Sequence, residues 1–323
     1  MRPISVVIPL IDEAESLSRL VEQISDVAAA NDYDLQVVMV DDGSTDSSWE
    51  VIEELAVADP RIEGIRLRRN FGKAAALSAG FRAATAPIVF TLDADLQDDP
   101  AEFPKLLAAI DDGADVVSGW KVDRKDPWHK TLPSLGFNTL VSWISGVRLH
   151  DHNCGLKCYR AEVLKEVRLY GELHRFVPVL ADARGYRVAE VGVHHRPREF
   201  GHSKYGVTRL IKGLLDIMTV KFITGFGDRP QHLLGAIGLL AFLMGALGLG
   251  YLAVAWCVTR AISAEPIHLH ETAMLYYALG LFVIGAQFLS VGLLGEMLTA
   301  HQLRDRDTYS IAERTKKSEP QSR

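Results

Sequence analysis

Two long stretches in the C-terminal third of the sequence carry no charged side chain, and they limit the fold more than any other feature. The first is 233–259, and the second is 272–294, where Gln287 is the main polar interruption. A helix needs roughly 20 apolar residues to cross the hydrocarbon core of a bilayer. We therefore expect two membrane-spanning helices, which 260–271 joins into a hairpin.

Basic residues flank this hairpin on one side. The connecting loop carries Arg260 as its only Lys or Arg, whereas the flanking segments hold Lys212, Lys221, Arg229, Arg304, Arg306, Arg314, Lys316 and Lys317. By the positive-inside rule, both chain termini are predicted to be cytoplasmic, with the protein in the cell inner membrane. Apolar and basic residues mix over 205–229, which predicts amphipathic helices on the membrane surface, although an ordinary core-facing helix shows the same pattern.

The composition disfavours several classes of protein. With 323 residues the chain is long enough for two domains, and its net charge of −6 gives no support for nucleic-acid binding. Its three cysteines cannot form a disulfide framework, so we expect reduced thiols in a cytosolic domain. The apolar run at the N-terminus is too short for a signal peptide.

Short apolar runs alternate with helical patterns over the first third of the chain. The runs are 4–8, 35–40, 62–67 and 88–92. Strands that alternate with helices predict an α/β fold with a doubly wound parallel sheet. Neither G-x-G-x-x-G nor a G-K-[ST] phosphate loop occurs in the sequence, which disfavours a dinucleotide oxidoreductase and a P-loop nucleotidase.

Carboxylates follow two of the expected strands. Asp41 and Asp42 end the second strand, and Asp93 and Asp95, with the amide Gln97, follow the fourth. Because ligands in open α/β sheets gather at the carboxyl ends of strands, these oxygens are expected to face one crevice. Mg²⁺ typically binds one or two carboxylates together with substrate phosphates, so the second group is a candidate metal and diphosphate site.

Both acidic groups also have a local interpretation. The pair Asp42-Gly43 is a strong turn signal, and Asp99-Pro100 followed by Glu102 has the pattern of a helix N-terminus. We assign Asp99 to a helix cap, and we keep the local and the functional interpretation open for the other carboxylates.

Four sequence motifs, in order, resemble family 2 glycosyltransferases. They are SVVIPLIDE at 5–13, VDDGSTD at 40–46, NFGKAAAL at 70–77 and DADLQDDP at 93–100. Within the family, the chain looks most like the polyprenyl-phosphate sugar synthases, and among these the bacterial undecaprenyl-phosphate glucosyltransferases. The resemblance implies a GT-A fold. It also implies a nucleotide-sugar pocket of Pro9, Glu13, Asp42, Lys73, Asp93 and Ala94, and a Mg²⁺ or Mn²⁺ site of Asp93, Asp95 and Gln97.

The same resemblance implies where a lipid phosphate binds. A basic segment with interspersed aromatic residues follows 116–120, and Lys and Arg suit a phosphate because they donate charge-assisted hydrogen bonds. The implied phosphate-binding residues are Lys121, Arg124, Ser134, Arg198, Ser203 and Lys204. Asp151 stands where the family has an Asp near the reacting centre, and it joins Asp93 and Asp95 as the predicted catalytic set. The alternative for the basic segment is a solvated loop, and the alternative for Asp151 is a simple turn.

The expected organisation has four parts. They are a cytoplasmic GT-A domain at 1–204, juxtamembrane amphipathic helices at 205–229, a transmembrane hairpin at 230–300 and a charged cytoplasmic tail at 301–323. The resemblance implies metal-dependent, inverting transfer of a single sugar from a nucleotide diphosphate to polyprenyl phosphate, for later use in cell-envelope glycosylation. UDP-glucose is the favoured donor, GDP-mannose the alternative and an aminoarabinose donor the third choice. We also expect a homo-oligomer.

Two other classes of protein are weighed against this one. A family 2 transferase that elongates a polysaccharide would have more membrane spans and a Gln-x-x-Arg-Trp motif, which this sequence lacks. A nucleotide-sensing membrane scaffold would have substituted acidic strand ends, and here they are intact.

Overall fold

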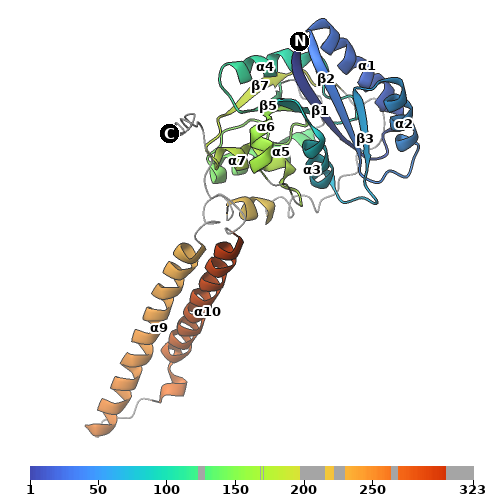
Figure 1. Cartoon of the computed structure of the whole chain (residues 1–323). Helices are drawn as coiled ribbons and strands as arrows, with labels where there is room; N and C mark the ends of the chain where they lie inside the picture. The colour runs from blue at the N-terminus through green and yellow to red at the C-terminus, as the bar shows by residue number, and fades with distance from the viewer. Residues whose placement is uncertain are drawn as a thin grey trace, which may run out of the picture. The chain divides into compact units, whose positions relative to one another are not determined.

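The chain divides into two compact units, Met1–Val220 and Lys221–Arg323, in a computed structural model of the protein (Figure 1). The structure describes residues 1–122, 128–167, 169, 171–196, 215–221, 230–262 and 268–302, and among these it leaves out the side chains of 128–135, 230 and 299–302. Each unit is described by itself. The first is an α/β unit and the second is a pair of long helices.

The first unit is built around a seven-stranded sheet with the order β3-β2-β1-β4-β6-β5-β7. The strands are β1 (Arg2–Leu10), β2 (Tyr33–Asp41), β3 (Ile62–Arg66), β4 (Ile88–Thr91), β5 (Val116–Lys121), β6 (Lys157–Arg160) and β7 (Val188–Val193). The first four strands are mutually parallel, and β5 pairs in parallel with β7. The predicted α/β fold and its first four strands are confirmed.

Strand β6 lies beyond the four strands that were predicted to be parallel, and it runs antiparallel to both of its neighbours, β4 and β5. The helix and loop that follow β5 return the chain to the sheet edge where β5 ended, so β6 begins at that edge and runs back. Parallel neighbours would need a crossover to the opposite edge. This reversal brings the start of β6 to the same edge as the carboxyl ends of β1, β2 and β4.

Helices cover both faces of the sheet. They are α1 (Ala14–Ala30), α2 (Ser48–Ala58), α3 (Lys73–Ala83), η1 (Pro100–Glu102), α4 (Phe103–Asp111), α5 (Trp128–Ser145), α6 (Ala161–Glu166), η2 (Leu173–Phe176) and α7 (Val177–Asp182), with a further short helix at 215–221. One buried cluster joins β1 to α1 and α4, and another joins β1 to α3 and α6. Because Val6 and Val7 fall in different clusters, β1 is buried on both faces, as its continuous apolar sequence predicts.

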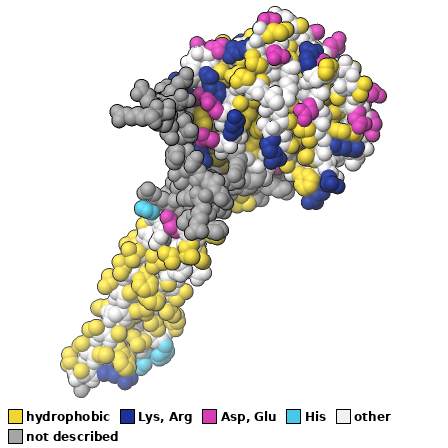
Figure 2. Space-filling view, viewed as in Figure 1, with side chains coloured by type: hydrophobic (Ala, Val, Ile, Leu, Met, Phe, Trp, Pro, Cys, Tyr) yellow, Lys and Arg dark blue, Asp and Glu magenta, His cyan; other side chains and the backbone are white. Residues whose placement is uncertain are grey.

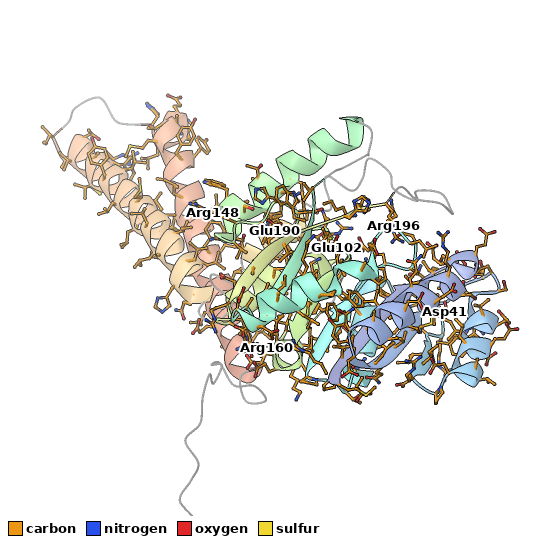
Figure 3. The ribbon with its side chains drawn as sticks, turned by 90° about the horizontal axis from the view of Figure 1, so that it is seen from above. Asp41, Glu102, Arg148, Arg160, Glu190 and Arg196 are labelled. Carbon is orange, nitrogen blue, oxygen red and sulfur yellow. The ribbon has the colours of Figure 1, made fainter. Side chains whose placement is uncertain are left out.

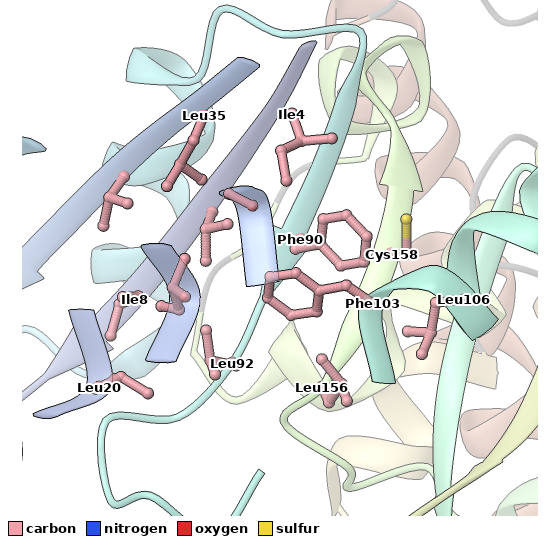
Figure 4. Packing of buried hydrophobic residues seen from close by; sticks show 14 of the residues in the cluster. Ile4, Ile8, Leu20, Leu35, Phe90, Leu92, Phe103, Leu106, Leu156 and Cys158 are labelled. Atoms are coloured by element: carbon pink, nitrogen blue, oxygen red, sulfur yellow. The ribbon is translucent and has the colours of Figure 1, made fainter. Parts of the chain in front are cut away.

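The larger cluster holds the centre of the sheet together (Figure 4). Phe90 of β4 stacks on Phe103 of α4, with ring centroids 4.2 Å apart. Leu20 and Ile24 of α1, four residues apart, lie fully buried in the same cluster, as expected for one face of a helix. This packing fixes β4 rigidly, and the acidic segment that follows β4 begins from that fixed end.

The second unit contains α9 (Pro230–Ala261), η3 (Leu269–Glu271) and α10 (Ala273–Gln302). Gln231–Ala261 and Ala273–Leu298 are long and apolar enough to cross a membrane, with mean hydropathies of 2.2 and 2.0. Apolar side chains cover the visible face of the two helices (Figure 2). The two predicted C-terminal helices are therefore confirmed. The four domain boundaries stay predictions, and most of the 205–229 segment lies outside the described residues.

Glycines bring the two long helices together. A Cβ atom on Gly245 would meet the backbone of α10 at Phe282, and one on Gly285 would meet the backbone of α9 at Phe242. The rings of Phe242 and Phe282 stack with centroids 4.4 Å apart. Close backbone approach at small residues is the usual way in which helices pack in lipid.

Candidate active site

Acidic and basic side chains gather at one edge of the sheet. Asp42 follows the end of β2, and Asp93 and Asp95 follow the end of β4. Because β1, β2 and β4 are parallel, these positions share the carboxyl edge. Lys157 begins the antiparallel strand β6 and therefore lies at the same edge. The structure thus brings the predicted acidic groups together and adds a lysine that the sequence analysis did not include.

Asp93 is surrounded by three lysines. The ammonium of Lys73, the first residue of α3, forms an ion pair with the Asp93 carboxylate. Burial opposes ionisation of Asp93, but Lys73, Lys121 and Lys157 outweigh it and lower the pKa of Asp93 to about 2. Asp93 is therefore an anion at neutral pH. Lys73, predicted in the nucleotide-sugar pocket, is thus next to the predicted catalytic carboxylate.

A glycine allows two carboxylates to converge. A Cβ atom on Gly155 would lie 2.7 Å from the Oδ2 atoms of both Asp93 and Asp98. Asp98 is 3 % exposed. Burial, together with Asp93 and Asp95, raises the pKa of Asp98 to about 6 against the effect of Lys121. Neither residue was predicted for the site, because Asp98 lies within an acidic run and a single glycine is not distinctive.

The segment after β7 closes over the acidic run. The backbone N–H of Arg196 donates to the carbonyl of Gln97 over 2.9 Å, and the side chains of Gln97 and His195 meet, with their Nε2 atoms 3.4 Å apart. Arg196, labelled in Figure 3, donates through its guanidinium to Asp99 over 2.6 Å. Gln97, predicted as a metal ligand, is therefore held against the segment that follows β7, which is far from it in the sequence.

The expected cap at Asp99 is observed, and Asp42 has a structural role in a neighbouring loop. The carboxylate of Asp99 accepts a hydrogen bond from the N–H of Ala101 over 3.0 Å, so the predicted cap at the start of η1 is confirmed. Asp42 is buried, and its two oxygens accept from the N–H groups of Phe71 and Gly72 over 2.8 and 2.9 Å. Asp42 thus fixes the loop that leads into α3 and positions Lys73. Its predicted contact with a nucleotide stays a prediction.

The loop of the first predicted motif is tied to the second. Asp12 has a positive φ of 52°, and its carboxylate accepts from the N–H of Thr45 over 2.8 Å. The N–H of Glu13, predicted in the nucleotide-sugar pocket, donates to the hydroxyl of Ser48 over 2.9 Å. These contacts hold the ends of β1 and β2 together.

A pocket opens beside Asp93. Its lining residues are Pro9, Lys73, Leu77, Thr91, Asp93, Asn153, Cys154, Gly155, Lys157, Tyr159, His174 and Arg175. Lys157 is 4 % exposed, and its ammonium donates to the carbonyl of Cys154. Burial, together with Lys73, Arg175 and Lys157, lowers the pKa of His174 to about 2, so this imidazole is uncharged. Three of the residues predicted to bind the nucleotide sugar line this pocket: Pro9, Lys73 and Asp93.

Asp151 is held in a buried turn. It is 1 % exposed, its carboxylate accepts from the N–H of Asn153 over 3.0 Å, and its own N–H donates to Glu190 of β7 over 2.9 Å. The next residue, His152, is fully buried with Nε2 3.0 Å from the hydroxyl of Ser142. Burial first, and Lys157 second, lower the pKa of His152 to about 4.

The predicted acceptor residues are only partly within the described chain. Lys121 ends β5, and although burial acts against its charge, Asp98, Cys154, Asp151 and Asp93 raise its pKa. Ser134 lies on α5, without a described side chain. Four predicted residues lie outside the described residues: Arg124, Arg198, Ser203 and Lys204. Ala94, predicted in the nucleotide-sugar pocket, is buried.

The oxygen donors at this edge suit a hard divalent cation. Among the described residues, no group of three or more His, Cys, Asp and Glu side chains is arranged to hold a metal ion. Mg²⁺ does not need one, since it typically binds one or two carboxylates and completes its shell with water and substrate phosphates. The carboxylates of Asp93 and Asp98 that converge beside Gly155, and the neighbouring Asp95 and Gln97, provide donors of that kind.

Comparison with known proteins agrees with these motifs. A sequence profile described as Glycosyl transferase family 2 matches residues 5–168. The chain is 33% identical to the dodecaprenyl-phosphate galacturonate synthase of Rhizobium johnstonii, over 94% of this chain and 89% of that protein. It is 34% identical to the undecaprenyl-phosphate 4-deoxy-4-formamido-L-arabinose transferase of Edwardsiella ictaluri, over 98% of this chain and 95% of that protein.

The fold also matches solved structures. One is glucosyl-3-phosphoglycerate synthase from Mycobacterium tuberculosis in complex with Mn²⁺, UDP and phosphoglyceric acid, with a TM-score of 0.54, 18% identity and 70% and 80% of the two chains covered. Another is the same enzyme with Mg²⁺ and UDP, with a TM-score of 0.53, 19% identity and 69% and 79% covered. These matches confirm the expected GT-A-like sheet. From the family profile and two relatives similar over nearly its whole length, this chain belongs to glycosyl transferase family 2 and is a glycosyltransferase.

Proposed function

We propose that this enzyme transfers one sugar from a nucleotide-diphosphate donor to a polyprenyl phosphate in the membrane. The observation that carries the proposal is that two relatives are both named for a polyprenyl phosphate. One is named for dodecaprenyl phosphate and the other for undecaprenyl phosphate, and each is similar to this chain over at least 94% of its length, including the two apolar helices. Their sugars differ, so the lipid acceptor is the common element.

The acceptor itself supplies the nucleophile. The second pKa of a phosphate monoester lies near about 6, so the oxygen that attacks is already anionic at neutral pH, and a strong general base is unnecessary. The protein must then position two anionic substrates in line and balance their charge. Lys121, beside the acidic cluster, suits the acceptor phosphate, together with Arg124 and Ser134 from the sequence prediction. Asp151, fixed in its buried turn, orients the reacting groups.

A divalent cation fits the donor side of the site. Asp93, Asp95 and Gln97 are the proposed ligands, with Mg²⁺ or Mn²⁺ as the ion. When bound, the cation neutralises the departing diphosphate as a Lewis acid. The Asp93–Lys73 ion pair keeps one carboxylate ionised and places an ammonium beside the diphosphate. Displacement in a single step inverts the anomeric centre and gives a β-linked lipid product from an α-linked donor.

The sugar is the least constrained part. The sequence favours UDP-glucose, with GDP-mannose as the alternative, whereas the relatives are named for galacturonate and for a formamido-arabinose. The hairpin and the flanking basic residues favour an enzyme that places the catalytic unit, and both termini, on the cytoplasmic side, where nucleotide sugars are made. We also propose that the enzyme forms a homo-oligomer.

The proposal is tested in membranes from cells that express the full chain. Membranes receive polyprenyl phosphate, Mg²⁺ and one labelled donor from a panel that includes UDP-glucose, GDP-mannose and UDP-galacturonate, and label is counted in the organic phase. We expect label from at least one donor, and a loss of at least about a hundredfold in Asp95→Asn. The matched control, Asp112→Asn, changes an exposed carboxylate at the end of α4 and is expected to retain activity. Wild-type rates in Asp95→Asn would contradict the proposal.

A further inference from the structure

The pocket beside Asp93 contains a buried lysine that forms no ion pair with a described residue. Three basic residues line it, and two of them are paired: Lys73 with Asp93, and Arg175 with Glu172 at 2.8 Å. Lys157 is buried, and within the described part of the chain its ammonium contacts the carbonyl of Cys154 and forms no ion pair. An unpaired buried charge is costly to maintain. Burial lowers the pKa of Lys157 although Asp151 and Asp93 favour its ammonium, so an anionic ligand beside Lys157 would stabilise its charge.

The same pocket contains polar atoms that lack a partner. Asn153 Oδ1 and His174 Nδ1 are buried, and neither has a hydrogen-bonding partner among the described residues. The amide oxygen of Asn153 can only accept a hydrogen bond, so its partner must carry an O–H or N–H group, which water or a ligand hydroxyl provides. Leaving such an atom unsatisfied costs about 1–3 kcal/mol. The pocket therefore calls for a ligand that provides hydroxyl hydrogens as well as negative charge.

These two requirements exclude most of the candidate groups. An ionised phosphate provides negative charge but has no hydrogen to donate to Asn153. A neutral hexose or a formamido sugar provides hydroxyl groups but no charge, so only the diphosphate of its donor could pair with Lys157. A sugar acid satisfies both requirements, because its hydroxyls donate and its carboxylate pairs with an ammonium. The relatives are named for one charged and one neutral sugar, so similarity alone does not choose between them, whereas the pocket does.

We propose that this pocket receives the donor sugar and that the sugar is a hexuronate, with its carboxylate on Lys157 and its hydroxyls on Asn153 and His174. This inference rests on the proposed function. In the transfer, the bond between the anomeric carbon and the diphosphate oxygen breaks, and the electron pair leaves with the nucleotide. An oxygen of the lipid phosphate forms the new bond to that carbon. The carboxylate is unchanged by the reaction and serves only in recognition.

The first test compares matched donors on the wild-type full-length enzyme. The pairs are UDP-galacturonate against UDP-galactose, UDP-glucuronate against UDP-glucose, and GDP-mannuronate against GDP-mannose. Within the pair whose nucleotide and sugar stereochemistry fit, we expect kcat/KM for the uronate to exceed that for the neutral sugar at least tenfold. Because this comparison needs no variant, it does not depend on whether a changed protein folds. Equal or better use of the neutral donors would overturn the proposal.

The second test asks whether Lys157 is responsible. In Lys157→Gln, the preference for the uronate is expected to fall to within about threefold of unity, mainly through a higher KM for the uronate, and Lys157→Arg is expected to restore part of it. Lys165→Gln, an exposed lysine on the next helix, is the matched control and should keep the wild-type preference. If Lys157 instead binds the diphosphate or only supports the fold, both donors lose activity together and the preference survives, which would overturn the proposal.

A binding measurement separates this inference from the proposed function. The purified full chain is titrated with each donor in the absence of lipid, and heat is recorded by calorimetry. If a uronate donor binds more tightly than its neutral partner but yields no lipid product with polyprenyl phosphate, the proposed acceptor is wrong and the sugar pocket stands. If lipid product forms only from neutral donors, the proposed function stands and the hexuronate pocket is wrong.

Discussion

The two units of this chain bury different kinds of side chain, and the difference shows what each must do. In the first unit, large apolar side chains such as Phe90 and Phe103 fill the sheet faces, and charged groups gather at one edge. In the second unit, α9 and α10 approach closely at glycines, while residues such as Leu247 and Tyr251 point outward and are 74 % and 63 % exposed.

This difference is the one expected if the two long helices lie in a membrane. Water drives apolar side chains into a core, whereas lipid tails solvate apolar side chains as well as a core does, so helix association in lipid depends on close packing. Substitutions that enlarge a glycine are therefore informative in both units, for different reasons. In the first unit they displace charged groups, and in the second they separate helices.

The largest effect is expected from Gly155→Ala. The added methyl group would lie 2.7 Å from the carboxylates of Asp93 and Asp98, so these side chains must move apart. We expect product formation to fall at least about a hundredfold in a folded protein, because small displacements of catalytic groups are costly. Gly136→Ala, where nothing lies within 4 Å, is the control and should retain activity. A fully active Gly155→Ala enzyme would show that the two carboxylates need not converge.

The matching change in the second unit is Gly285→Leu. Its side chain would collide with the backbone of α9 at Phe242, whereas Gly280→Leu on the same helix meets nothing within 4 Å. We expect Gly285→Leu to destabilise the helix pair by about 1–3 kcal/mol, as overpacking does elsewhere, and Gly280→Leu to change it little. Thermal unfolding of the full chain in detergent measures both. Equal melting temperatures for the two variants would contradict the glycine contact between the helices.

Acidification is expected to destabilise the first unit. Burial lowers the pKa of His152 to about 4 and that of His174 to about 2, both below the ordinary 6.5. Below pH 6.5 the unfolded chain therefore binds protons that the folded chain does not, so stability falls as pH falls. Asp98 acts in the opposite direction. Its pKa is raised to about 6, so below that pH the folded chain binds one proton that the unfolded chain does not.

The net difference is about one proton, which corresponds to roughly 1.4 kcal/mol per pH unit below pH 6. The melting temperature of the full chain, measured between pH 7 and pH 5, is expected to drop accordingly. His174→Gln removes one of the two imidazoles and should flatten the dependence. A melting temperature that rises on acidification would show that protonation of Asp98 outweighs the effect of the two histidines.

The smallest effect is expected from Asp111→Asn. Asp111 accepts two hydrogen bonds of 2.8 Å from the guanidinium of Arg2, but both side chains are substantially exposed, at 58 % and 36 %. Exposed ion pairs contribute little because water and salt screen them. We expect a loss below about 1 kcal/mol in urea unfolding, with unchanged activity. A larger loss would mean that the start of β1, where Arg2 lies, is stabilised substantially by this ion pair.

The sequence predicts those parts of the molecule whose signals are local. The four parallel strands follow from apolar runs, and the hairpin follows from two uncharged stretches. The placement of Asp93, Asp95 and Gln97 at one sheet edge follows from strand ends and from the family resemblance. The cap at Asp99 follows from the proline after it.

The missed features depend on tertiary pairing. Strand β6 is four residues long and contains Lys157 and Arg160, so it lacks an apolar signature, and its antiparallel direction is decided by its neighbours. Lys157, Gly155 and His174 join the site only because that strand and η2 reach the same edge. Isolated Lys, Gly and His residues carry no sequence signal of their own for such a role.

The most direct test of the account is whether the sugar goes to a lipid phosphate. The purified full-length enzyme is given a labelled nucleotide sugar that it binds, together with either polyprenyl phosphate or the corresponding polyprenol, and label is counted in the organic phase. The account predicts a product with polyprenyl phosphate that requires a divalent cation and Asp95, and none with the polyprenol. Equal labelling of both lipids, or labelling of neither by an enzyme that binds the donor, would contradict it.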